Sequence, residues 1–203
     1  MVVVVIVSIL ASLALPGLLG GTKDLAVYQA AQRVAELVQN GRSRALATGS
    51  AHAIVFSTNG NGRFAVQQGT RTAGVTTNLP INTCRQAGAF GMDISTNVAT
   101  SNVVAPNTSP VVDQLVFASE DRLVEYDVRA TPFSGGPGGA EVWICFTPTG
   151  RAYVASSAST LVSADALVAP FVVPIARFEG GVQQGLSRNV LVVPGGAPRI
   201  FSK

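Results

Sequence analysis

The sequence predicts an α+β protein in which one long N-terminal helix precedes an antiparallel sheet. Two observations support this class. The first fifty residues combine an apolar run with helical periodicity, and the rest of the chain contains short runs of β-branched and aromatic residues separated by turn residues. Strand signals at short spacing after a single helix are typical of α+β domains. The length of 203 residues allows this helix and one domain of about 150 residues.

The first half of the predicted helix is almost purely apolar. Residues 2–19 are nearly all Val, Ile, Leu and Ala, and the first charge is Lys23. At about 1.5 Å per residue, this run would span roughly 29 Å, which is close to the hydrocarbon thickness of a bilayer. We therefore assign residues 1–21 to a hydrophobic half of the helix and residues 22–203 to a globular domain that includes its second half.

The second half has the periodicity of an amphipathic helix. Apolar residues recur three and four positions apart, with charged and amide residues between them: Val27, Ala30, Ala31, Val34, Leu37 and Val38. This pattern predicts one stripe that packs on a domain, and one helix over about Val2 to Thr48. A cleaved signal peptide would have a basic start, whereas no Lys or Arg precedes the apolar run. A transmembrane anchor with an attached domain stays open.

The clearest hairpin follows the helix directly. Ala51–Thr58 and Arg63–Gln68 read as strands, and Asn59–Gly62 supplies residues that tolerate positive φ. Residues 69–110 are rich in Thr, Asn, Ala and Gly and predict a long variable excursion, with short strand pieces around Thr76–Ile81 and Phe90–Ile94.

Further strand signals fill the second half of the chain. Val111–Ser119 and Arg122–Val128 are predicted as two strands around a Glu120–Asp121 turn. Glu141–Pro148 is apolar at both alternating sets of positions, which favours a central strand. The remaining candidates are residues 151–156, Phe171–Gly180 and Asn189–Phe201, the last with a turn at Gly195–Gly196.

Residue types that carry catalysis or bind metals are scarce. His52 is the only histidine and lies in a predicted strand, which favours a structural role. One histidine and two distant cysteines do not make a closed zinc set. The acidic stretch does not have the spacing of a calcium loop and predicts a solvated face: Asp113, Glu120, Asp121, Glu125 and Asp127. We expect no enzyme activity, no cofactor and no metal.

Several segments resemble one protein family. MVVVVIVSILASLALPGLLG resembles the N-terminal helix of type IV pilins and type II secretion pseudopilins, including a proline at Pro16. GRSRALATGSAHAIVF, CFTPTGRAYV and SRNVLVVPGGAPRIF resemble the helix end, a turn and the closing hairpin of the GspH/FimT branch. The resemblance implies a pilin-like fold and a structural role as a minor pilin or pseudopilin of a type IV pilus or a type II secretion pseudopilus.

The resemblance also implies how such a subunit assembles. The apolar half would lie in the inner membrane, with the domain in the periplasm, and would later pack against other pilin or pseudopilin subunits. The helix residues assigned to this role are Val2, Val5, Ile9, Leu13, Pro16 and Gly17. Pro16 removes a helical hydrogen bond. It therefore predicts either a simple kink or, as the resemblance implies, a segment that loses helicity in the filament.

The diagnostic start of the family is not in this sequence. A basic leader ending in Gly and the motif Phe-Thr-Leu-x-Glu would come just before Met1, so we expect the leader and the first mature residues to be missing. The prepilin peptidase is a partner if that leader exists, and the N-methylated residue is placed on no residue here. Pilin-like domains lie where a disulfide can persist, so Cys84 and Cys145 are either bridged or two buried thiols.

Two other functions stay open. Some members of the branch bind DNA through C-terminal basic residues, and this chain has four cations against Glu179 alone: Arg177, Arg188, Arg199 and Lys203. Half of the Gly-Arg-x-Arg type end is missing, because the chain has Gly196-Ala197-Pro198-Arg199. The same cations could guard a solvated hairpin edge. The third possibility is a membrane-anchored periplasmic domain that forms no filament.

Overall fold

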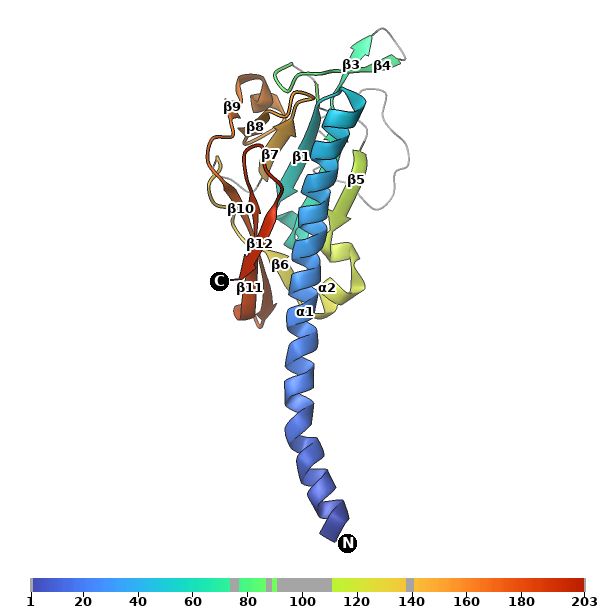
Figure 1. Cartoon of the computed structure of the whole chain (residues 1–203), viewed down its shortest axis with the longest axis vertical. Coiled ribbons are helices and arrows are strands. Elements are labelled where there is room, and N and C mark those ends of the chain that lie inside the picture. The colour runs from blue at the N-terminus through green and yellow to red at the C-terminus, as the bar shows by residue number, and fades with distance from the viewer. Residues whose placement is uncertain (1, 74–76, 87–88, 91–110, 138–140, 203) are drawn as a thin grey trace.

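A computed structural model of the chain describes residues 2–73, 77–86, 89–90, 111–137 and 141–202, without the side chains of residues 2–20 and 71–78. Helix α1 runs without interruption over Val2–Thr48, 47 residues. This confirms the prediction of one long helix. Figure 1 shows that the C-terminal half of α1 lies along the domain, whereas its N-terminal half extends away from it.

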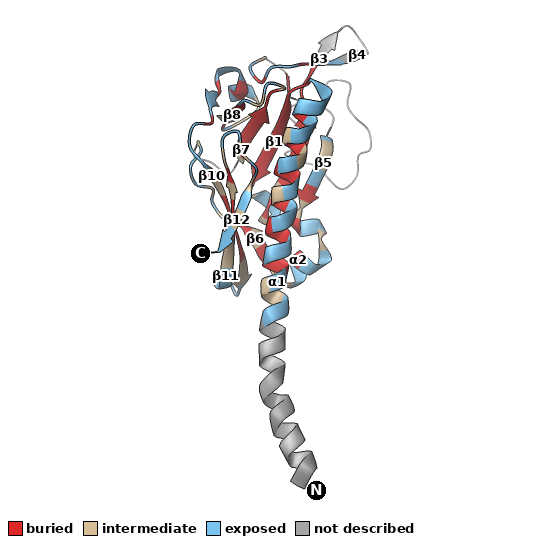
Figure 2. Cartoon of the chain, in the orientation of Figure 1, coloured by how far each residue is buried: buried red, intermediate tan, exposed pale blue. Residues whose placement is uncertain are grey.

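The second half of α1 packs on the domain through the predicted stripe. Its buried residues are Ala26, Val27, Ala30, Ala31, Val34, Leu37, Val38 and Ala45, and Figure 2 shows this stripe as red bands between exposed turns. The helix ends at Gly49, whose φ of +66° is the left-handed conformation that often follows a helix.

Within the described residues, the strands form three antiparallel sheets. The largest has the order β5-β2-β1-β7-β8-β9. Its strands are β1 His52–Ser57, β2 Arg63–Gln68, β5 Val111–Val116, β7 Glu141–Phe146, β8 Ala152–Ala155 and β9 Asp165–Ala166. The second has the order β12-β11-β10-β6, with β6 Val128–Ala130, β10 Phe171–Glu179, β11 Val182–Val192 and β12 Arg199–Ser202. A small third sheet pairs β3 Thr70–Ala73 with β4 Thr77–Pro80.

The prediction of a single sheet around the helix was therefore incomplete. Helix α1 lies against strands of both larger sheets (Figure 1), and aromatic side chains join the sheets beneath it. Phe56 of β1 meets Phe171 of β10 edge-on, with 5.2 Å between the ring centroids. Phe56 also packs against Phe64 of β2, at 5.9 Å.

Strand β7 is buried on both faces, as its sequence predicted. Val142, Ile144 and Phe146 belong to the core beneath α1. Trp143 and Cys145 belong to a second core on the opposite face, with Ile81, Ala89 and Phe90 among its members. The six-stranded sheet therefore separates two apolar layers, and residues 81–86 and 89–90 help to cover the layer far from the helix.

One predicted strand was wrong. Residues 122–128 form the end of a short helix, α2 (Asp121–Glu125), and only the start of β6. Helical geometry places Leu123 and Tyr126, three residues apart, on one side, and both pack on the main core. Asp127 has φ +48° and turns the chain into β6. The predicted Glu120–Asp121 turn is the entry to this helix.

Some predictions fall outside the described residues. The side chains of the apolar half of α1, Lys203, most of the predicted Phe90–Ile94 strand and much of the 69–110 excursion belong to this group. When only residues with described side chains are considered, no helix is long and apolar enough to cross a membrane. The anchor assigned to Val2–Leu19 stays a prediction. The described part of the chain also contains three short 3₁₀ helices, at Asn59–Asn61, Phe117–Ser119 and Ser159–Ser163.

Candidate functional site

The candidate site is the region where α1 leaves the domain beside the β10–β11 hairpin (Figure 1). The hairpin turns at Gly180 and Gly181, which have φ of +59° and +83° between the paired residues Glu179 and Val182. Positive φ at both central residues is the requirement of the tight turns that suit hairpin twist. The Gly-Gly dipeptide was a signal for this hairpin that the sequence analysis did not use.

The hairpin is fixed to α1 by a close approach at Gly185. This residue has φ +70°, and a Cβ atom there would lie 2.7 Å from the Asp24 carboxylate of α1 and 3.8 Å from Nη2 of Arg177. Glycine has no Cβ that would displace the Asp24 carboxylate, and its left-handed conformation costs no steric strain. The register of β11 against β10 shifts here, between Ile175 and Arg177, so the strand bends as it passes the helix.

The structure places the predicted basic residues in different environments. Arg177 has a side chain only 13% exposed and forms an ion pair with Glu179, at 3.2 Å. The Arg188 guanidinium stacks over the ring of Tyr28 on α1, 5.6 Å from its centroid. Arg199 is exposed on the edge strand β12, opposite Leu191, and Lys203 lies outside the described residues. Arg188 thus meets the helix, Arg177 lies beside Gly185 of β11, and Arg199 stands apart from that contact.

Four large apolar side chains are exposed in the same region. Leu25 and Tyr28 of α1 are 51% and 38% exposed, and Val182 and Leu186 of β11 are 62% and 47% exposed. We call these four residues the neck surface. Sequence reasoning missed it, because the hydrophobic stripe of α1 could be recognised but its neighbours from β11 could not.

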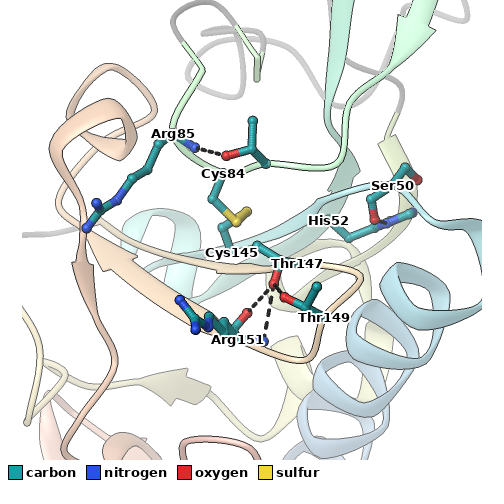
Figure 3. Close-up of a disulfide and its surroundings, with 9 residues drawn as sticks. Ser50, His52, Cys84, Arg85, Cys145, Thr147, Thr149 and Arg151 are labelled. Atoms are coloured by element: carbon teal, nitrogen blue, oxygen red, sulfur yellow. Dashed lines mark hydrogen bonds between the residues drawn. A yellow bond between two sulfur atoms is a disulfide. The ribbon is translucent and has the colours of Figure 1, made fainter.

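The two cysteines are joined by a disulfide between the far-face segment and the central strand. Cys84 and Cys145 have Cα atoms 5.9 Å apart and are 61 residues apart in sequence; Figure 3 shows the bridge beside β7. The adjacent Arg85 donates a hydrogen bond to the Ala164 carbonyl at 2.6 Å and lies over the Tyr153 ring. This group holds the segment around residue 84 on the sheet.

His52 is buried near the end of α1. It is 1% exposed, and its Nδ1 lies 3.1 Å from the Ser50 carbonyl oxygen, as Figure 3 shows. Burial lowers the pKa of His52 below its ordinary value, outweighing the hydrogen bond to Ser50. The neutral ring is therefore favoured in the fold, and its burial and its hydrogen bond to a backbone carbonyl indicate a packing role.

A polar groove lies between α1 and α2. It has a volume of about 600 Å³ and is open to solvent, and the Arg33–Glu120 ion pair crosses it at 2.7 Å. The acidic residues of the predicted solvated face are partly paired, since Asn40 donates to Asp113 and Arg129 pairs with Asp127. No group of side chains in the described part of the chain could hold a metal ion.

Comparison with known proteins gives no relative. No family model, no curated protein and no solved structure matches this chain. The function must therefore be argued from the arrangement of its own residues.

Proposed function

We propose that this protein is a structural subunit, a minor pilin or pseudopilin, of a type IV pilus or a type II secretion pseudopilus. The observation that carries the proposal is the division of α1. Its second half packs on the domain from Ala26 onward, while its first half continues away from the domain as helix with a sequence that has no charge before Lys23.

An uncharged helix of this kind has an energetic reason to find an apolar environment. Exposure of the fourteen Val, Ile, Leu and Ala side chains of residues 2–19 to water would be unfavourable, because each fully buried large apolar side chain contributes about 1.5–3 kcal/mol. A bilayer or a bundle of identical helices can bury them. The proposal uses both environments in sequence: the inner membrane first, then the filament with other pilin or pseudopilin subunits.

Cross-linking in the membrane and in the filament tests the proposal. Because the native cysteines are bridged, cysteines introduced at Val5 and Leu13 would be the free thiols of the full chain. Oxidation of the variant with both cysteines should produce a ladder of multimers in sheared filament material. The variant with Leu13→Cys alone should stop at dimers, because each subunit then has one free thiol. Monomers confined to the membrane fraction would support the anchored domain without a filament. A monomeric full chain that needs no detergent would refute both.

A second experiment examines Pro16 and Gly17. In lipid, an unsatisfied backbone group costs several kcal/mol, so the segment should stay helical there. In a filament, neighbouring subunits surround it, and this constraint is relaxed. Replacing both residues with Ala should stabilise a continuous helix and reduce filament yield without changing the unfolding of the domain. Normal assembly of this variant would contradict a role for local melting.

A further inference from the structure

The neck surface has the composition of a membrane-interface contact. It combines the aliphatic residues Leu25, Val182 and Leu186 with the aromatic Tyr28. The Arg188 guanidinium lies over the Tyr28 ring, 5.6 Å from the ring centroid. Tyrosine is enriched at membrane–water interfaces, where its apolar body and polar tip are both accommodated. Arginine stems likewise cover apolar surface while the charged head stays in water.

The level of this surface along α1 matches the headgroup layer. Asp24, which lies beside the hairpin at Gly185, follows Leu19, the end of the apolar run, by five residues, or about 7.5 Å of helical rise. The polar layer on each side of the hydrocarbon core is roughly 5–7.5 Å thick, so Asp24 lies at its outer boundary. If Val2–Leu19 occupies the hydrocarbon core, the hairpin is held at the depth of the lipid headgroups.

Charge distinguishes the hairpin side of α1 from its opposite side. Around the hairpin contact, Lys23, Arg177 and Arg188 outnumber Asp24 and Glu179. On the other flank, three acidic residues of α2 and its entry face two arginines, Arg122 of α2 and Arg33 of α1, which pairs with Glu120: Glu120, Asp121 and Glu125. An anionic lipid surface attracts the first flank and repels the second.

We propose that, before assembly, the domain leans on the bilayer through the β10–β11 hairpin, with the neck surface at the boundary between headgroups and acyl chains. This inference rests on the membrane insertion in the proposed function. A transmembrane helix tilts by about 20° on average, and interfacial side chains decide the direction. The neck surface directs this tilt so that the β11 side of the domain approaches the bilayer and the α2 side moves away from it.

A lipid surface fits the neck surface better than a second copy of the chain does. Leu25 and Tyr28 follow, along α1, the segment proposed to lie in the bilayer. Arg188 lies against Tyr28 of the neck surface, where an anionic headgroup could pair with it. A second copy would have to cover Val182 and Leu186 while α1 is still surrounded by lipid.

Lipid quenching of a single fluorophore tests the inference on the full chain. Val182→Cys supplies one free thiol for a polarity-sensitive label, since the native cysteines are bridged. The matched control is Val168→Cys, which is 86% exposed and precedes the opposite end of β10. Both proteins are reconstituted in phosphatidylcholine vesicles with and without phosphatidylglycerol, and with lipids spin-labelled near the headgroup.

The label at residue 182 should be quenched at least about twofold more than the label at residue 168, with a further increase in anionic vesicles. Leu186→Ser in the labelled Val182→Cys protein should reduce that quenching, while the control position stays unchanged. Equal quenching at both positions overturns the inference. Energy transfer between labels at residue 182 of different copies, without quenching by lipid, also overturns it, because the hairpins would then contact each other. Flotation with the vesicles separates the hypotheses: a chain that does not float refutes the membrane step of the proposed function, and a floating chain with a water-exposed hairpin refutes this inference alone.

Discussion

Removing the Cys84–Cys145 disulfide should lower the stability of the domain by a large and predictable amount. We consider the double variant Cys84→Ala and Cys145→Ala, in which both side chains are fully buried. The bridge spans 61 residues of sequence. In the chain-entropy model, opening a loop of this length restores about 14 cal/mol/K to the unfolded chain, or about 4 kcal/mol at 25 °C.

The native contacts around the bridge indicate which region opens first. Phe90 lies 6.5 Å from Trp143 between ring centroids, and Ile81 and Ala89 cover the same face of the sheet. Without the bridge, these contacts and the Arg85 hydrogen bond must hold the segment alone. We expect the backbone amides of residues 81–86 to exchange with solvent faster than those of β7.

Urea unfolding of the full chain in detergent, followed by Trp143 fluorescence, measures the effect. With a slope of about 2 kcal/mol per molar urea, the midpoint should fall by about 2 M in the double variant. Reductant should lower the wild-type midpoint toward the same value and leave the variant unchanged. Two titratable thiols in denatured protein from an oxidising compartment, or equal midpoints for both proteins, would refute the reasoning.

Three further predictions concern stability and use the same assay. Burial lowers the pKa of His52 from its ordinary value of 6.5, so at lower pH the unfolded chain binds a proton that the folded chain does not. The free energy of unfolding should therefore fall as pH drops below about 6.5. His52→Gln should remove that pH dependence. Gly185→Ala should cost about 2 kcal/mol, through positive φ and displacement of the Asp24 carboxylate, whereas Gly180→Ala, with positive φ but open space, should cost about 1 kcal/mol. Phe56→Ala should cost about 3–5 kcal/mol, because the ring joins two sheets, whereas Val168→Ala should change stability by less than about 0.5 kcal/mol; similar losses for the two members of either pair would contradict the packing argument.

Local patterns predicted most of the individual elements. The apolar run and the three- and four-residue spacing predicted α1 to its observed ends, because helical periodicity depends only on neighbours along the chain. Two strand-like runs, residues 51–58 and 63–68, on either side of the turn residues 59–62 predicted β1, β2 and their hairpin for the same reason. The two apolar faces of Glu141–Phe146 predicted a strand buried on both sides. The scarcity of histidine and cysteine also limited the chemistry that could be expected.

The tertiary structure decided the features that depend on distant residues. Residues 121–125 became α2 because Leu123 and Tyr126 meet the core only in helical geometry, and a five-residue segment has too little intrinsic preference to settle the choice alone. Division into separate sheets, with Phe171 against Phe56, follows from packing around α1. The neck surface exists because Gly185 lets β11 approach Asp24 across more than 150 positions of sequence. No local pattern contains that contact, because it forms only when the space beside the helix is filled by the closing hairpin.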